Sequence, residues 1–201
     1  MADNKIDLIP AVAVRSIATG MLMMACFTCM WAGMAYSGLA DGGFKFILII
    51  FIPFVIAFIV NAVKLFKISK YYPTLTDEAD IAEGKRTGKW FGIIFGAEGL
   101  GIFIAINIVV KLGHADLIIP VIALVVGLHF FPLARVFKRT IDYYLATWST
   151  VIAILGLVFI LNKTIPQHAT IAFVGIGLAI ATTCYGIYMM ISGGKLAKPT
   201  V

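Results

Sequence analysis

The sequence predicts an all-α integral membrane protein with six transmembrane helices paired as three antiparallel hairpins. Its 201 residues are 61% hydrophobic and only 13% charged, with a mean hydropathy of +1.01, whereas soluble domains are about 45–50% apolar. Six apolar runs alternate with short polar connectors, and each approaches the ~20 residues that a helix needs to cross ~30 Å of hydrocarbon. We therefore expect a single polytopic domain over residues 1–201, with the lipid bilayer as its main partner.

The apolar runs set the expected bounds of the six spans. We place them at about residues 14–40, 46–64, 89–111, 117–136, 142–162 and 169–192. The connectors on one side are short and rich in Gly and Pro, so sequence neighbours should pack as antiparallel pairs. Pro53 and Pro132 fall within the second and fourth spans and are expected to bend them.

The longest connector, at about residues 65–88, carries charges of both signs. Its acidic stretch after Pro73 predicts a short helix, capped by Thr74 or Thr76, because acids favour the first turn of a helix. Gly84 is expected to end this helix before the third span begins.

The positions of the cations predict the orientation. With the N-terminus in the cytoplasm, all but three of the 16 lysines and arginines lie on the cytoplasmic side, as the positive-inside rule requires. The exceptions are Lys45, Lys111 and Lys163. Both termini are therefore expected in the cytoplasm, with a bacterial inner membrane as the expected location. The start of the chain lacks the pattern of a cleavable signal, so the first span is expected to act as an uncleaved insertion signal. Since topology accounts for the net charge of +6, a nucleic-acid partner is not expected.

Glu98 interrupts the third span near its expected midpoint. A charged carboxylate at that depth costs ~2.5–3.5 kcal/mol by insertion scales, so such residues are usually paired, protonated or functional. Two interpretations stay open: Glu98 fixes the helix register as a protonated, hydrogen-bonded acid, or it titrates, binds an ion or binds a substrate.

His129, in the fourth span, is the expected partner of Glu98. The third and fourth spans are neighbours in sequence, and helical rise places the two residues within about 5 Å of the same depth. A carboxylate and an imidazole in contact can share a proton. Asn107, Thr182 and Thr183 are further candidates for the lining of this site. For His129, the competing interpretation is a hydrogen-bonded packing residue.

Two weaker candidate sites remain. Cys26 and Cys29 are three residues apart on one span and Cys184 lies at a comparable depth, so with His129 they could hold zinc or copper(I). Ordinary packing explains the cysteines better, and neither a metal nor another cofactor is expected. Near the end of the fourth span lies a second group of candidates, for binding an anionic headgroup, although membrane anchoring also explains it. These residues are Arg135, Lys138 and Arg139.

Small residues form stripes on two spans. Gly92, Gly96 and Gly99 share a face of the third span, and Gly175 and Gly186 belong to a similar stripe on the sixth. Such stripes let helices approach closely in lipid. They predict either close packing within the chain or a homo-oligomer built on these faces.

Three functions are compatible with these features. The first is binding or translocation of a small solute or ion, with proton coupling as an option. The second is a non-catalytic accessory or scaffold protein, and the third is a membrane-embedded enzyme acting on a lipid or quinone. The sequence lacks the GxGxxG, GxxxxGK[ST], HExxH and GxSxG motifs, so an enzyme is the less favoured expectation.

Overall fold

The computed structural model describes residues 10–39, 43–74 and 77–196, and all of the regular secondary structure in these residues is helical. Six long helices are each long and apolar enough to cross a membrane, alone or with an adjoining 3-10 turn. They are α1 (Ala11–Gly38), α2 (Phe51–Ile68), α3 (Glu78–Lys111), α4 (Ile118–Phe137), α5 (Thr140–Leu161) and α6 (Gln167–Leu196). The 3-10 segments are η1 (Gly43–Ile50), η2 (Ser69–Tyr71) and η3 (Ala115–Leu117). The prediction of an all-α chain with six candidate spans is confirmed.

The most extensive contact between helices is that of α1 with α6, and α6 is the most buried of the six candidate spans. Small residues allow this close approach. A Cβ atom added to Gly175 would lie 2.6 Å from the Ala35 nitrogen, and one added to Gly38 would lie 2.5 Å from the Ala172 nitrogen. The stripe on α6 therefore serves packing within the chain, because the backbones of α1 and α6 meet there.

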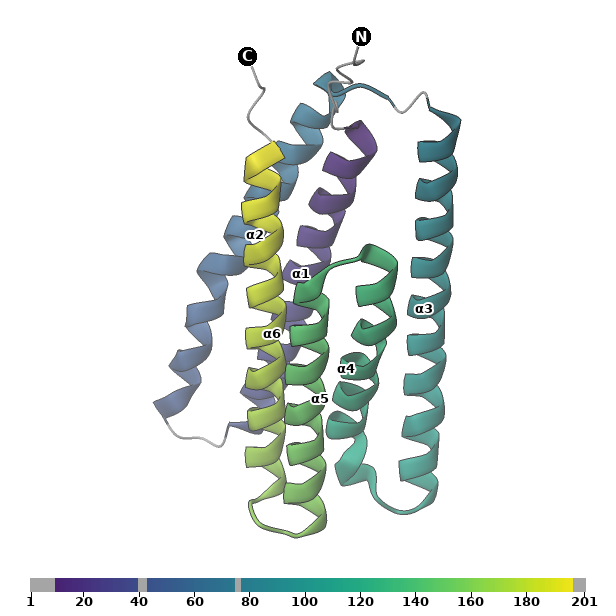
Figure 1. Ribbon diagram of the computed structural model, residues 1–201. Helices are drawn as coiled ribbons and strands as arrows, with labels where there is room; N and C mark the ends of the chain where they lie inside the picture. The colour runs from purple at the N-terminus through teal and green to yellow at the C-terminus, as the bar shows by residue number, and fades with distance from the viewer. Residues whose placement is uncertain (1–9, 40–42, 75–76, 197–201) are drawn as a thin grey trace.

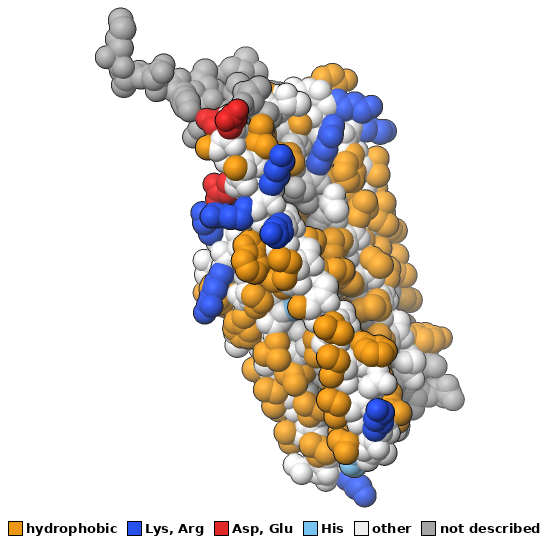
Figure 2. All heavy atoms as spheres, turned by 90° about the vertical axis from the view of Figure 1, so that its right-hand side faces the viewer, with side chains coloured by type: hydrophobic (Ala, Val, Ile, Leu, Met, Phe, Trp, Pro, Cys, Tyr) orange, Lys and Arg blue, Asp and Glu red, His pale blue; other side chains and the backbone are white. Residues whose placement is uncertain are grey.

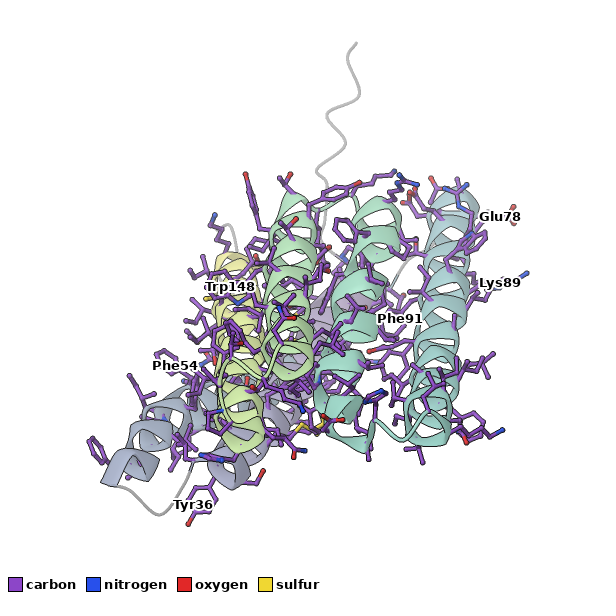
Figure 3. All side chains as sticks on the ribbon, turned by 90° about the horizontal axis from the view of Figure 1, so that it is seen from below. Tyr36, Phe54, Glu78, Lys89, Phe91 and Trp148 are labelled. Carbon is purple, nitrogen blue, oxygen red and sulfur yellow. The ribbon has the colours of Figure 1, made fainter. Side chains whose placement is uncertain are left out.

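At the side of the bundle, α3 packs mainly against α4 (Figure 1). Of its 34 residues, Ile94 and Val109 are the buried ones. Figure 3 shows Phe91 on the side of α3 that faces α4, whereas Lys89 points away from the bundle. Apolar side chains cover the middle of the face that carries α3, and lysines and arginines gather toward one end of it (Figure 2). This helix is the element least embedded in the rest of the chain.

The connector between α2 and α3 differs from the prediction. Instead of a loop over residues 65–88, α2 continues to Ile68 and α3 begins at Glu78. The expected helix end at Gly84 is wrong, since α3 runs through it without a break. A single glycine costs only about 1 kcal/mol relative to alanine in a helix interior, which is too little to stop a helix that continues into an apolar span.

The cap of α3 also differs from the prediction. Asp77 is the N-cap residue, and its carboxylate accepts a hydrogen bond from the Ala79 backbone N–H at 2.9 Å. Thr74 precedes the cap, and Thr76 lies outside the described residues. The acidic first turn was predicted correctly, with Glu78 and Asp80 in it, because acids there complement the helix dipole.

The two prolines expected to bend helices lie in different settings. Pro53 is the third residue of α2 and follows the 3-10 segment η1. The first backbone N–H groups of an α-helix have no intrahelical partner, so a proline is tolerated there without a kink. Pro132 lies in the interior of α4, where proline does remove a helical hydrogen bond.

The beginning of α1, the connection from α2 to α3 and the end of α6 meet at one end of the bundle. The Ala11 N–H donates to the Pro73 carbonyl at 2.9 Å, and the Tyr72 hydroxyl donates to the Leu196 carbonyl. The turn between α4 and α5 stops short of this end, below the ends of α3 and α6 (Figure 1). Near the start of α5, Asp142 is buried, whereas Thr140, Tyr143 and Tyr144 are exposed.

Candidate functional site

Glu98 and His129 meet at the interface between α3 and α4. The Glu98 Oε1 atom lies 3.4 Å from the His129 Nδ1 atom, and the two side chains are 10% and 11% exposed. Glu98 comes from the side of α3 that faces α4, and His129 from the second half of α4. The contact falls short of a regular hydrogen bond, because Nδ1 has no partner of good hydrogen-bond geometry. The structure thus brings together the two residues that the sequence suggested as a pair.

Three further contacts hold α3 against α4 on either side of this pair. Toward the beginning of α3, Lys138 and Glu83 form an exposed salt bridge of 3.3 Å. About two helical turns before Glu98, the Phe91 ring packs against the Phe137 ring with centroids 5.9 Å apart. Beyond Glu98, Gly101 lies against the Val125 side chain. The Glu98–His129 pair is the polar contact in the middle of this interface.

The pair can hold a proton in more than one arrangement. An ion pair of carboxylate and imidazolium, or a neutral acid beside a neutral imidazole, avoids leaving one unpaired charge in hydrocarbon. The two atoms that would exchange the proton are 3.4 Å apart. The arrangement can therefore bind and release a proton or a cation, and the charge on the α3–α4 interface changes when it does.

The other residues predicted to line the site lie elsewhere. Asn107 is exposed on α3 and donates to the Phe103 carbonyl at 2.8 Å, on the side away from the bundle. Thr182 is buried at the α1–α6 interface, where its hydroxyl lies 2.9 Å from that of Thr28. Thr183 bonds to the Ala179 carbonyl within α6. These three residues do not line one site with Glu98 and His129, because each of them lies on a different helix face.

The cysteines and the cationic cluster are also dispersed. Cys26, Cys29 and Cys184 are all exposed, and no group of three metal-ligating residues of the His, Cys, Asp or Glu type occurs among the described residues. In the proposed headgroup cluster, Lys138 already pairs with Glu83. Arg139 donates to the Tyr185 hydroxyl at 3.4 Å, which leaves Arg135 as the cation of this cluster that is exposed and bears no described side-chain contact.

Asp142 is a buried polar residue that the sequence analysis did not single out. Its side chain is 0% exposed in the first turn of α5. An acid in a first turn gains only about 0.3–1 kcal/mol from the helix dipole, whereas the effective cost of burying an unpaired ion is several kcal/mol. The position follows an exposed turn, so its place in the sequence does not indicate burial. A period-3.6 pattern of small and apolar residues along α5 is the signal that could have suggested it.

The fold and the site together define a class: an all-helical protein with six candidate membrane spans and a polar pair between two of them. Comparison of the chain with protein-family models, curated proteins and solved structures finds no match. Its function is therefore argued from the geometry of its own residues.

Proposed function

We propose that this polytopic membrane protein binds a small solute or ion at the Glu98–His129 pair, or carries it across the membrane, with exchange of a proton at the pair. The observation that carries the proposal is the 3.4 Å contact between a carboxylate and an imidazole, both about nine-tenths buried, on two apolar helices. Ionisable residues within membrane-spanning segments are costly and most often belong to ion, proton or substrate pathways.

The packing of α3 supports a route of access to this pair. Because α3 contacts the bundle mainly through α4, a small displacement of α3 would expose Glu98 and His129 without disturbing the core between α1 and α6. Loss or gain of a proton changes the attraction between the two side chains. Ligand binding that exchanges this proton would therefore also alter how firmly α3 packs against α4.

We further propose that the chain is one polytopic domain of three antiparallel hairpins with both termini in the cytoplasm, in a bacterial inner membrane. Short connectors after α1, α3 and α5 support the pairing of sequence neighbours. The positive-inside rule supports the orientation, since Lys111 and Lys163 fall at the opposite end from most of the other cations.

Native mass spectrometry of the detergent-purified protein tests the proposal. The wild type is compared with Glu98→Gln and with Asp80→Asn, a control that removes an exposed acid in the first turn of the same helix. We expect an adduct of a small solute or ion on the wild type and on Asp80→Asn that Glu98→Gln loses. An identical adduct pattern in all three proteins would contradict a ligand site at Glu98.

The outer face of α3 favours a second candidate function, that of a non-catalytic accessory protein or scaffold. A Cβ atom added to Gly92, Gly96 or Gly99 would meet nothing within 4 Å, so this small-residue face is unoccupied in the single chain. A helix from a partner or from a second copy could pack there. In that case Glu98→Gln would lower stability or assembly, and substitution of Gly96 by leucine would abolish the partner complex seen by cross-linking in membranes.

A further inference from the structure

We propose that Asp142 is a second proton-binding carboxyl group, held between α5 and α6 with the Tyr185 hydroxyl as its hydrogen-bonding neighbour. This site is separate from the Glu98–His129 pair and does not depend on the function proposed for that pair. The ligand is the proton itself, which converts a buried carboxylate to a neutral acid.

The burial of Asp142 carries the inference. Its side chain is 0% exposed, and neither carboxylate oxygen has a hydrogen-bond partner of good geometry. Among the described residues no cation forms a salt bridge to it within 4.0 Å. An ionised carboxylate in this setting would have no salt-bridge partner within 4.0 Å and no donor in good hydrogen-bond geometry, which is a costly arrangement in an apolar interior. A bound proton removes the charge and supplies an O–H donor.

Two polar groups face Asp142, from α6 and from the turn before α5. The Tyr185 hydroxyl is a polar neighbour of Asp142, at a geometry short of a regular hydrogen bond, and the Arg139 guanidinium is close enough to act on its charge. Arg139 makes contacts with other residues: it donates to the Tyr185 hydroxyl at 3.4 Å, and its guanidinium carbon lies 4.9 Å from the centre of the Phe137 ring. On α1, Arg15 donates to the Ser69 hydroxyl at the end of α2 instead.

The ring of Phe130 contacts both the His129 ring and the Tyr185 ring. Its centroid lies 4.2 Å from that of the His129 ring on one side and 6.1 Å from that of Tyr185 on the other. An aromatic ring cannot continue a hydrogen-bond chain between acids and hydroxyls. The neighbour that the two sites share is therefore an apolar ring, which offers no hydrogen-bonded path between their carboxyl groups.

Infrared spectroscopy of the full-length protein in phosphatidylcholine vesicles tests this inference, because a protonated carboxyl group has a C=O stretching band that an ionised one lacks. Spectra at neutral pH are compared for the wild type, Asp142→Asn, Glu98→Gln and the exposed control Asp80→Asn. We expect an acid band that disappears in Asp142→Asn and persists in the other two variants. A spectrum from which Asp142→Asn removes no acid band would overturn the proposal.

Tyr185→Phe keeps the test decisive if Asp142→Asn does not fold. Removing the hydroxyl weakens the hydrogen bonding of the acid, so its C=O band should move to higher frequency, and an unmoved band would overturn the proposal. The outcomes also separate the two sites. A band lost only in Glu98→Gln supports the pair and refutes the role of Asp142, whereas a band lost only in Asp142→Asn supports this inference whatever happens at the pair.

Discussion

The contact between Glu98 and His129 predicts a measurable coupling free energy. We consider the cycle of Glu98→Gln, His129→Leu and the double variant, in which leucine fills the space of the imidazole without adding a donor. Both side chains are about nine-tenths buried, so water screens their interaction little. The Oε1–Nδ1 separation of 3.4 Å is longer than that of an optimal charged hydrogen bond. The coupling free energy should therefore be smaller than that of the strongest charged hydrogen bonds.

These two facts set the expected magnitude. Polar contacts between membrane helices average about 0.6 kcal/mol with a maximum near 1.7, and hydrogen bonds to charged groups reach about 1.5–3 kcal/mol. We expect a coupling free energy of about 1–1.5 kcal/mol, roughly tenfold in the unfolding equilibrium constant at its upper end. The double variant should thus be more stable than the sum of the two single losses implies.

Reversible unfolding in mixed detergent micelles provides the assay, and a second pair on the same two elements provides the control. Glu83 and Lys138 are 3.3 Å apart but 55% and 77% exposed, so their cycle should give at most about 0.5 kcal/mol. Additive effects at Glu98 and His129, or a coupling no larger than that of the exposed pair, would refute the reasoning that burial strengthens this contact.

Three further predictions concern packing and exposure. Gly175→Ala should destabilise the protein by about 1–3 kcal/mol, because its methyl group would meet the α1 backbone. Gly92→Ala, on the open face of α3, should be neutral or stabilising. Unfolding in detergent measures both, and equal losses of stability would contradict the assigned packing. Thr28→Val should cost about 0.6–1.7 kcal/mol by breaking its buried 2.9 Å contact with Thr182, and a loss of zero in the same assay would argue against that hydrogen bond. Replacing the three exposed cysteines by alanine should change stability by no more than about 0.5 kcal/mol per site, and a cysteine-free protein that fails to fold would show that they have an unrecognised structural role.

The fold was largely predictable because hydropathy and length act over each helix separately. Six apolar runs of sufficient length predict six helices whatever their mutual arrangement. The errors lie where a local signal was weaker than its surroundings. Gly84 suggested a helix end, but its modest intrinsic cost was outweighed by the helix on both sides of it. Asp77, rather than either threonine, caps that helix, and sequence alone does not rank such neighbouring caps reliably.

The candidate site was predictable only in part. Glu98 and His129 could be paired by depth, since a short connector makes their helices neighbours and helical rise fixes the height of each residue. Depth gives no information on rotation between helices, which is why Asn107, Thr182 and Thr183 were grouped with the pair although they face other directions.

Asp142 was missed for a related reason, since its burial depends on how the helices pack around the start of α5.

The measurement that tests the central claim most directly is the nitrogen-15 magnetic resonance titration of the His129 ring. Histidine-labelled protein in bicelles is compared with its Glu98→Gln variant, and His129→Leu identifies the signal among the three histidines. If the pair shares an exchangeable proton, the His129 ring nitrogens should titrate, and the midpoint of that titration should move when Glu98 loses its charge. A His129 signal that does not titrate, or one whose midpoint is the same in both proteins, would contradict the account.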